Sequence, residues 1–192
     1  MQYRFIVSMF LLLFASPLFA DTPDAFMIGA DISWIPAEEH KGLRYSDRGT
    51  EGDILAILKS HGFNWIRLRI FVDPTAEGGY SKDGFCGLAE TLKMARRVKD
   101  ADMKLLLDFH YSDTWADPAH QTKPLAWRDY DIDRLETAVE DYTAEVIAEF
   151  KRNDVLPDMV QVGNEVNHGM LWPEGRAANA ENLVRLIKAG VR

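Results

Sequence analysis

The stretch "VQVGNEVN" (residues 160–167) carries a carboxylate to the tip of an apolar segment. Glutamate is among the residues least often buried without a partner, so Glu165 needs either a partner or a chemical task. Gly163 and Asn164 beside it suit close approach and hydrogen bonding better than packing. This pattern favours a functional interpretation of Glu165 over a purely structural one.

Charged and polar side chains also alternate with aliphatic ones along the apolar segments that precede it. Since successive residues of a strand point to opposite faces, the polar side chains share one face of each segment. The set comprises Asp31, Arg67, Arg69, Asp108, His110 and Glu165. If these strands close into a barrel, the charges on its inner face often neutralise one another. For Arg69 and Asp108 such structural pairing is the competing interpretation.

A segment rich in both aromatic and polar residues follows the third of these strands. It contains Asp113, Trp115, Asp117, His120, Lys123 and Trp127. The C–H faces of a pyranose stack on aromatic rings, and its hydroxyls need directional hydrogen-bonding partners. The segment therefore predicts a sugar-binding loop, with a tryptophan-anchored structural loop as the alternative. Trp172 and Pro173, just past the fourth strand, either wall the same cleft or pack a loop.

The same region contains residue types that bind metals, but not in the arrangement of a metal site. Asp108, His110, Asp113, Asp117 and His120 lack the closely paired spacing of a histidine site. Two of these groups also stand beside tryptophans. The sequence therefore predicts neither a metal nor another cofactor. A metal-dependent hydrolase is the less favoured alternative, which chelation would inactivate.

Four strands in regular alternation with helices are expected to position these residues. The strands are predicted at residues 27–33, 64–72, 104–112 and 159–167. Apolar residues at helical spacing predict a helix after each strand, around residues 54–61, 88–98, 135–150 and 183–190. Thr50 to Asp53 has the spacing of a capping box for the first helix, and Gly62 ends it. This alternation indicates a parallel sheet covered by helices.

The polarity of the strand faces decides between an open doubly wound sheet and a closed barrel. In the second strand the aliphatic residues share one face, whereas Arg67 and Arg69 share the other. A doubly wound sheet needs two apolar faces, but a barrel has an inner face that turns polar where active sites lie. We predict an α/β fold, a (β/α)8 TIM barrel, of which the chain holds the N-terminal half. Strict alternation turns Asn164 outward, so it reaches the interior only if its strand ends or bulges there.

The N-terminal residues have the layout of a secretory signal peptide. Arg4 precedes an apolar run, and the small Ala20 stands at the expected cleavage point. The predicted organisation is a signal peptide at 1–20 and part of a catalytic barrel domain at 21–192. A membrane anchor is the alternative, but the apolar run is short for a spanning helix. We expect a secreted protein, extracellular or periplasmic, without membrane association after cleavage.

Charge and cysteine content exclude several partners. The chain has 22 Lys plus Arg against 30 Asp plus Glu, a formal net charge of −8. Without a basic cluster it lacks the electrostatic footprint of a nucleic-acid-binding protein. One cysteine, Cys86, rules out an internal disulfide. The acidic balance suits a neutral, polar substrate.

Two long motifs resemble a known enzyme family. The segments "LDFHYSDTWADPAHQTKPLAW" (107–127) and "VGNEVNHGMLWP" (162–173) are similar to the signature of the endo-β-1,4-galactanases of glycoside hydrolase family 53. "GADISW" (29–34) and "IRLRIFVDP" (66–74) match the first two strands of that family. The resemblance covers residues 27–192. The third-strand motif is highly specific, whereas an Asn-Glu pair indicates only the wider clan of retaining barrel glycosidases.

The resemblance implies roles for individual residues. Glu165 matches the acid/base that protonates the leaving oxygen, Asn164 the neighbour that binds the sugar 2-hydroxyl, and Arg67 the arginine that positions the nucleophile. A general acid must arrive protonated, which burial at the strand tip would achieve by raising its pKa. The expected substrate contacts are Asp31, His110, Asp113, Trp115, Asp117, Pro118, Ala119, His120 and Trp172. Phe71 departs from the family, whose members more often carry tryptophan there.

The implied activity is endo-acting hydrolysis of β-1,4-galactosidic bonds in galactan or arabinogalactan by a retaining double displacement. In this barrel clan the nucleophile is a glutamate after the seventh strand. A chain with four strand–helix units is therefore expected to be a fragment that lacks it, and the complete enzyme is expected to be a monomer. Alternatives are another retaining barrel glycosidase, such as a mannanase or cellulase, and a galactan-binding fragment without catalysis.

Overall fold

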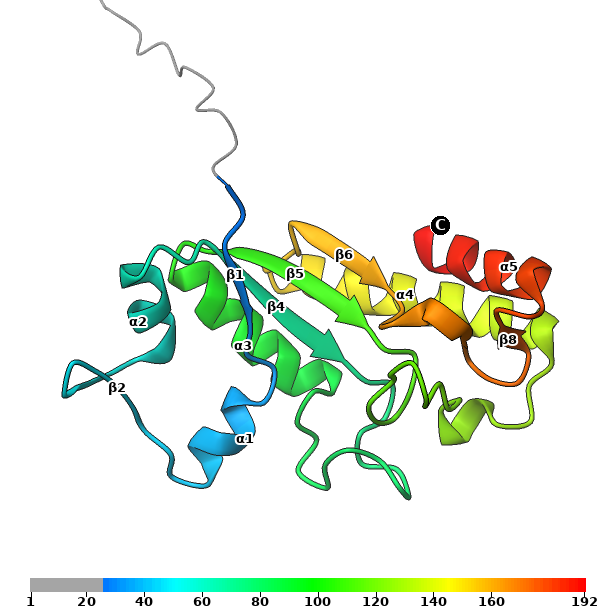
Figure 1. The fold of residues 1–192 in the computed structure, drawn as a ribbon, viewed down its shortest axis with the longest axis horizontal. Coiled ribbons are helices and arrows are strands. Elements are labelled where there is room, and N and C mark those ends of the chain that lie inside the picture. Colours follow the sequence, from blue (N-terminus) through cyan, green and yellow to red (C-terminus); the bar gives the residue numbers. More distant parts are fainter. Residues whose placement is uncertain (1–25) are drawn as a thin grey trace, which may run out of the picture.

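A parallel four-stranded sheet forms the centre of the molecule, in a computed structural model that describes residues 26–192 (Figure 1). The predicted signal peptide lies outside the described residues. The strands, in spatial order, are β1 (Gly29–Asp31), β4 (Trp65–Ile70), β5 (Lys104–Phe109) and β6 (Met159–Val162). Each lies within a predicted strand and all pairings are parallel, so the expected sheet is confirmed, with shorter strands.

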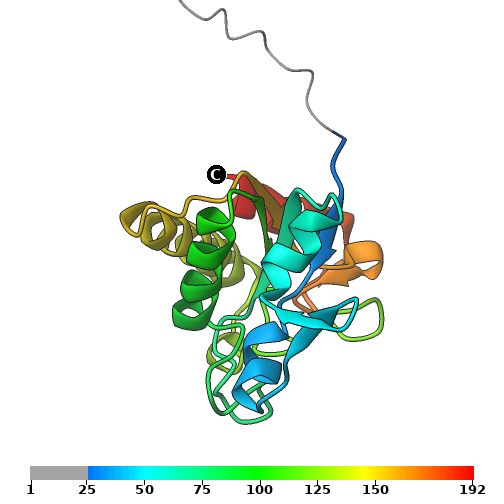
Figure 2. The same cartoon turned by 90° about the vertical axis from the view of Figure 1, so that its left-hand side faces the viewer.

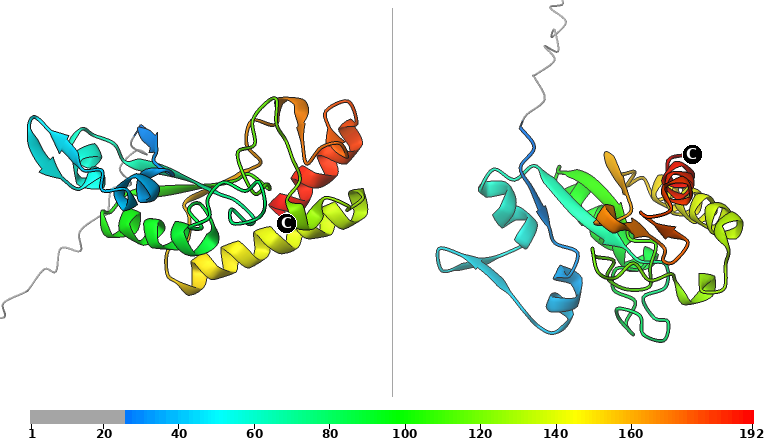
Figure 3. Two further views of the ribbon diagram at one scale, coloured as in Figure 1. Left: turned by 90° about the horizontal axis from the view of Figure 1, so that it is seen from below. Right: turned by 45° about the vertical axis from the view of Figure 1, so that its right-hand side comes forward.

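Helices lie between the successive strands of this sheet and after its last strand (Figure 1). They are α1 (Ile35–His40), α2 (Ile54–Ser60), α3 (Leu88–Asp100), α4 (Ile132–Arg152) and α5 (Ala180–Val191), with 3-10 turns η1 (Leu125–Trp127) and η2 (Val166–His168). Two small antiparallel pairs are added: β2 (Tyr45–Asp47) with β3 (Thr50–Gly52), and β7 (Gly169–Met170) with β8 (Gly175–Arg176). The helices α3 and α4 lie side by side on one face of the sheet (Figure 2; Figure 3, left).

The start of α2 differs from the predicted capping box. Residues Thr50–Gly52 pair with Tyr45–Asp47, so their backbone groups serve a hairpin and not a helix cap. Asp53 caps the helix instead, because its carboxylate accepts hydrogen bonds from the amides of Leu55 (2.9 Å) and Ala56 (3.2 Å). An aspartate at this position satisfies amides that have no partner within the helix.

The aliphatic faces of the strands form the core against α3 and α4. Ile66, Leu68, Leu105, Leu107 and Phe109 are each no more than 2% exposed. They belong to one cluster with Met94, Ala95 and Val98 of α3 and Leu135, Val139 and Val146 of α4. Burial of one such side chain contributes about 1.5–3 kcal/mol. This layer therefore holds the sheet in place and leaves its opposite face to the polar side chains.

Strand β6 ends at Val162, well before the end that alternation predicts. Gly163 follows in a left-handed conformation (φ +80°), and a Cβ there would lie 2.7 Å from Val166 Cγ1. Glycine accepts both conditions, since it has no Cβ. The turn brings Asn164 onto the polar face, where it bonds Arg67. The strand thus ends where Asn164 must turn inward, as the alternation argument required.

Candidate active site

Arg67 joins side chains from all four strands of the parallel sheet. Its guanidinium donates hydrogen bonds to Asp31 at the end of β1, to Asp108 Oδ2 on β5 (2.5 Å) and to Asn164 Oδ1 after β6 (2.7 Å). Side chains near the carboxyl ends of neighbouring parallel strands meet at the edge where barrel active sites lie. The structure therefore brings together Arg67, Asn164 and Asp31, which the sequence placed in one site.

Asp31 pairs with both arginines of β4. Arg69, which is 5% exposed, donates to the same carboxylate oxygen as Arg67, and the Ser33 hydroxyl donates to the other oxygen (2.6 Å). Burial acts to raise the pKa of Asp31, but the Ser33 hydrogen bonds and the charges of Arg69 and Arg67 outweigh it and hold this pKa below its usual value. Arg69 therefore neutralises the charge of Asp31, as the competing, structural interpretation of Arg69 predicts.

Trp115 stacks on the buried Arg69. The guanidinium carbon of Arg69 lies 3.8 Å from the centroid of the Trp115 ring and 5.6 Å from that of Trp34. Both tryptophans are 41% exposed, and Tyr80 meets Trp115 edge to face at 6.3 Å. A cation over one face of an indole ring is favourable. The exposed part of the Trp115 ring remains available to stack on a sugar.

The amide of Asn164 is held at both ends. Its Oδ1 accepts from Arg67, and its Nδ2 donates to the carbonyl oxygen of Ala116 (2.6 Å). Gln121 Nε2 adds a hydrogen bond to the Asn164 backbone carbonyl (2.8 Å). Because Arg67 can only donate and the Ala116 carbonyl can only accept, the side-chain amide of Asn164 has one orientation. The side chain of Asn164 is thus fixed within the cluster.

His110 forms the floor of the cluster and is 2% exposed. Its Nδ1 accepts a hydrogen bond from the Ala116 amide (3.0 Å), so in the neutral ring Nε2 carries the hydrogen. That Nε2 lies 3.0 Å from Asp108 Oδ2. Phe71, the residue that departs from the family pattern, packs edge to face against the His110 ring, with 5.0 Å between the ring centroids.

Glu165 is exposed, which differs from the buried setting that we expected. Its carboxylate has no hydrogen-bond or ion-pair partner within residues 26–192, and its backbone is left-handed (φ 49°). The early end of β6 explains the difference, because the strand stops before Glu165 and the sheet does not cover it. A left-handed backbone is uncommon for a residue with a side chain, and such residues cluster at functional sites.

Asp113 anchors the loop through both of its carboxylate oxygens. Its two carboxylate oxygens accept hydrogen bonds from the backbone amides of Asp73 (2.9 Å) and Leu125 (2.7 Å). Burial raises the pKa of this carboxyl, while those two amides act in the opposite direction. Asp113 thus connects the loops that follow β4 and β5, and both of its oxygens are already used.

The turn from Asp117 to His120 projects from the same loop and is closed on itself. Asp117 Oδ1 accepts from the amides of Ala119 (2.7 Å) and His120 (2.8 Å), and His120 Nδ1 lies 2.9 Å from Oδ2. The His120 side chain, followed by these amides, lowers the pKa of Asp117. Pro118 and Ala119 shape the turn, so all four predicted residues act as one exposed unit.

Trp172 connects the loop after β6 to this turn. Its backbone amide donates to the Gln121 carbonyl (2.7 Å), and its indole Nε1 donates to the His168 carbonyl (3.0 Å). The guanidinium carbon of Arg176 lies 4.5 Å from the ring centroid. Trp172 therefore packs its own loop and also stands beside the turn that the sequence assigned to the cleft.

Sequence reasoning missed several residues of this region. Trp34 was not singled out, although it directly follows a strand whose last residues carry the polar side chains Asp31 and Ser33. Tyr80 and Gln121 lie in loops, and no periodicity could have placed them. Their positions depend on loop paths that only the folded chain defines.

Within residues 26–192, no group of three or more His, Cys, Asp or Glu side chains is arranged to hold a metal ion. In the same part of the chain, no helix is long and apolar enough to cross a membrane. A pocket lined by residues of α4 lies away from the Arg67 cluster, on the outer side of that helix.

Fold and site together define a class. Four parallel strand–helix units with a charged cluster at the carboxyl ends of the strands are part of a (β/α)8 barrel fold. Within that class the chain belongs to glycosyl hydrolase family 53, whose sequence model matches residues 27–192. The resemblance noted from the motifs is thereby confirmed.

Individual relatives agree with this assignment. The chain is 41% identical to an arabinogalactan endo-β-1,4-galactanase A of Aspergillus niger over 181 residues, which cover 94% of this chain and 49% of that protein. An uncharacterized protein of Niallia circulans is 47% identical over 160 residues, 83% of this chain and 42% of its own. The chain spans about half the length of these relatives.

Solved structures give the same result. The family 53 catalytic domain of Ignisphaera aggregans is 42% identical, with a TM-score of 0.81 over 90% of this chain and 48% of that chain. A fungal β-1,4-galactanase structure is 37% identical, with a TM-score of 0.79 over 86% of this chain and 48% of that chain.

Proposed function

We propose that this chain is part of an endo-acting β-1,4-galactanase that hydrolyses galactan or arabinogalactan with retention of configuration. Membership of family 53 and the galactanase names of relatives support the substrate. The observation that carries the proposal is the fixed Arg67–Asn164 pair beside the exposed, unpaired Glu165. An amide and a carboxyl at adjacent positions can hold a sugar hydroxyl and protonate the neighbouring glycosidic oxygen.

Glu165 is the general acid/base of the proposed reaction. It first donates a proton to the leaving oxygen and then takes one from the attacking water, and each transfer typically contributes a factor of about 10²–10⁴. Asn164 holds the 2-hydroxyl of the sugar being cleaved. Arg67 supplies positive charge beside the position where the nucleophilic carboxylate must lie.

The nucleophile is proposed to come from outside the described residues. A retaining glycosidase needs two carboxyls about 5–5.5 Å apart. Asp108 is fully buried and paired with Arg67, and Asp31 is shared by two arginines. Neither is free to attack a sugar carbon. This supports a chain that supplies the acid/base half of the site and a later strand of the barrel that supplies the nucleophile.

The substrate contacts divide into three kinds. Trp115 provides a stacking surface, His110 lies on the floor, and the Asp117–His120 turn with Trp172 forms a wall. Asp31 acts through Arg67, while Asp113 shapes the loop. The remaining parts of the proposal are a secreted location, extracellular or periplasmic, a monomeric complete enzyme, and catalysis without a cofactor, nucleic acid or membrane partner.

A binding role without catalysis is the second candidate, because no free nucleophilic carboxylate lies beside Glu165 within residues 26–192. The test is reducing-sugar release from linear β-1,4-galactan, β-1,4-mannan and cellulose by the chain joined to the rest of its barrel. We expect release from galactan alone, and no loss of activity with a chelator. Binding of galactan without release would favour the second candidate, and release from mannan or cellulose would overturn the substrate assignment.

A further inference from the structure

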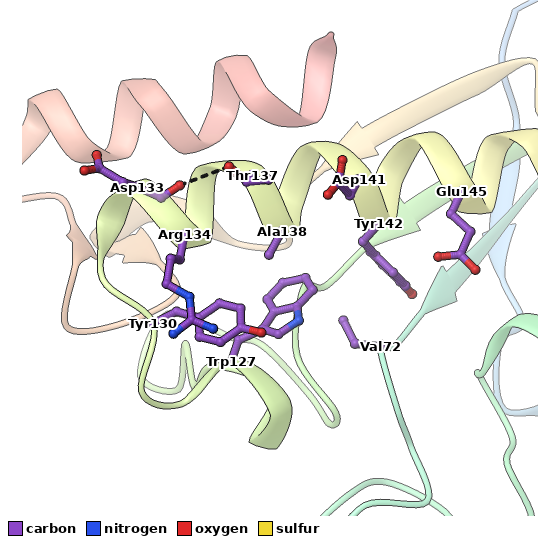
Figure 4. Close-up of a pocket in the computed structure, with 10 residues that line it drawn as sticks. All are labelled: Val72, Trp127, Tyr130, Asp133, Arg134, Thr137, Ala138, Asp141, Tyr142 and Glu145. Carbon is purple, nitrogen blue, oxygen red and sulfur yellow. Dashed lines mark hydrogen bonds between the residues drawn. The ribbon is translucent and has the colours of Figure 1, made fainter.

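A pocket of about 620 Å³ lies on the outer side of α4, away from the Arg67 cluster. Figure 4 shows its lining: Arg134 extends from the helix over Tyr130, and Tyr142 and Glu145 project farther along the same helix. The size falls in the usual range for ligand pockets, about 300–1,000 Å³. No residue of the pocket belongs to the proposed catalytic cluster.

One stripe of α4 builds the rim of the pocket. Arg134, Ala138, Asp141 and Glu145 follow helical spacing and share a face. The face toward α5 is different: Arg185 pairs there with Glu136 (2.8 Å), and Arg192 pairs with Glu140 (3.1 Å). Asp133, which also lines the pocket, pairs with Arg185 (2.6 Å), so the pocket adjoins the α5 side at this end of the helix.

The floor of the pocket is apolar and rigid. Trp127 meets Tyr142 edge to face at 6.0 Å, and the Tyr142 hydroxyl donates to the Phe71 carbonyl (2.9 Å). Val72 completes the floor. The Tyr142 hydroxyl and both rings are already fixed. Binding of a ligand would therefore require little rearrangement of these side chains.

Two carboxylates at the rim lack partners. Helix α4 carries six acidic residues, and four of them, Asp133, Glu136, Glu140 and Glu149, form ion pairs with arginines. Asp141 and Glu145 have no hydrogen-bond or ion-pair partner within residues 26–192. They stand at i and i+4, where like charges repel each other and destabilise a helix. Both carboxylates line the pocket, and no side chain within residues 26–192 donates a hydrogen bond to them.

The charges of the rim select the chemistry of the ligand. The guanidinium carbon of Arg134 lies 3.8 Å from the centroid of the Tyr130 ring and already occupies the place where a ligand cation would stack. The carboxylates of Asp141 and Glu145 repel an anion. A neutral polyol fits both conditions, since its hydroxyls can donate to the carboxylates and accept from Arg134 while its C–H face lies on the floor.

We propose that this pocket is a second saccharide-binding site, which holds a distant part of the same galactan chain outside the catalytic cleft. The choice of galactan rests on the proposed function, whereas the polyol chemistry rests on the pocket alone. A second contact on a long polymer raises its effective concentration at the cleft, so the site acts on polysaccharide and not on short oligosaccharides.

The test is affinity electrophoresis of the complete enzyme in gels with linear β-1,4-galactan, in a Glu165→Gln background that prevents digestion. We expect Asp141→Asn with Glu145→Gln to weaken retardation about tenfold, because two charge-assisted hydrogen bonds are lost. Glu140→Gln, on the α5 side of the same helix, is the matched control and should not change retardation. The double variant removes a like-charge pair, so its folding should not suffer.

A second arm separates this inference from the proposed function. With Glu165 intact, the double variant should cleave galactotetraose at the normal rate and long galactan more slowly. If galactan retards the double variant as strongly as the parent, or does not retard the parent at all, the second site is overturned even if hydrolysis is normal. Retardation that depends on Asp141 and Glu145 without any galactan hydrolysis supports the site and contradicts the proposed activity.

Discussion

Glu165 differs from the acidic residues of the Arg67 cluster because it carries no ion pair. Asp31 and Asp108 are fixed by arginines, whereas the Glu165 carboxylate is free to move a proton. We expect Glu165→Gln, in an enzyme that contains the whole barrel, to lower turnover of β-1,4-galactan by about 10²–10⁴-fold or more, since an amide cannot serve as the acid. Initial rates on galactan and on an aryl galactoside with a good leaving group measure the effect. The aryl substrate should lose less, because its departure needs less protonation.

The exposed position of Glu165 provides the control for this variant. Its side chain contributes no packing or pairing, so the melting temperature should not change. Near-normal turnover on unactivated galactan would place the general acid elsewhere.

Trp115 is the residue that we propose to stack on the sugar. Arg69 holds one face of its ring, and 41% of the side chain is exposed. Trp115→Ala should weaken oligosaccharide binding by about 1–3 kcal/mol, the scale of a lost aromatic contact. The Michaelis constant on galactan measures this change. Leu125→Ala, in the same loop and equally exposed, is the control; an unchanged Michaelis constant for Trp115→Ala would remove the ring from the cleft.

Strand alternation predicted which side chains meet at the site, but not their surroundings. The polar face of β1, β4 and β5 could be read from the sequence because the period of a strand is two. The role of Asp113 could not, since its partners are backbone amides of Asp73 and Leu125 in other loops. The expected burial of Glu165 failed for a related reason: it depended on where β6 ends.

At the scale of elements, the turn after β6 determines where Asn164 points. Gly163 has a left-handed backbone (φ +80°). A Cβ at this position would lie only 2.7 Å from Val166 Cγ1. Gly163→Ala should lower the free energy of unfolding by about 1–3 kcal/mol and should also reduce galactan turnover, because Asn164 would shift from Arg67. Thermal unfolding and rate measurements on the same preparation test both effects.

Gly42 offers a matched control for the Gly163 variant. It has φ +90° but nothing within 4 Å of a Cβ. Gly42→Ala therefore carries the backbone strain without the clash, and activity should be normal. Equal loss of activity in both variants would show that the turn at Gly163 has no special part in positioning Asn164.

Asp158, before β6, connects three elements through one carboxylate. It accepts hydrogen bonds from Lys99 of α3 (2.6 Å), Lys104 of β5 (2.8 Å) and the Leu105 amide (2.9 Å). Burial acts to raise the pKa of Asp158, but the two lysines and the amide outweigh it and lower this pKa to about 2. A lowered pKa contributes stability that is present above the ordinary value of 3.8 and is lost as pH falls through about 2.

The Asp158→Asn variant should remove that dependence. Its free energy of unfolding at pH 7 should be lower by about 1–3 kcal/mol, the range for lost hydrogen bonds to a charged group. Between about pH 4 and pH 2 the difference from the parent should shrink, since the parent loses its carboxylate there. Urea unfolding at several pH values gives both quantities. A difference that stays constant down to pH 2 would mean that Asp158 is not ionised in these bonds.

The longer elements could be predicted and the short ones could not. Helix α4 and strands β4 and β5 have enough residues to display their period, and each was found near its observed bounds. The hairpin of β2 and β3 has three residues in each strand, and β7 and β8 have two, so no alternation is visible. The capping box failed because the same residues had a second use in that hairpin.

At the scale of the whole molecule, the described sheet has two unpaired edges, β1 and β6. Apolar side chains are exposed at both: Met27 and Ile28 beside β1, and Leu156, Met159, Val160 and Val191 beside β6. Leu156, Val160 and Val191 also line a groove of about 480 Å³ between α4 and α5. A parallel edge of this kind can pair with another chain, which natural proteins avoid by covering it. In a complete barrel such edges pair with further strands.

We therefore expect the 192-residue chain, purified alone, to self-associate through these edges and to lack galactanase activity. Val160→Lys places a charge on the β6 edge and should shift the sedimentation of the chain toward the monomer, because a buried lysine without a partner is unfavourable. Val184→Lys makes the same change on α5 outside that groove, at a position with 47% exposure, and should leave association unchanged. Sedimentation velocity over a range of concentrations distinguishes the two. A parent chain that stays monomeric at every concentration and hydrolyses galactan in a Glu165-dependent way would contradict the expectation, and would require a nucleophile among the residues already described.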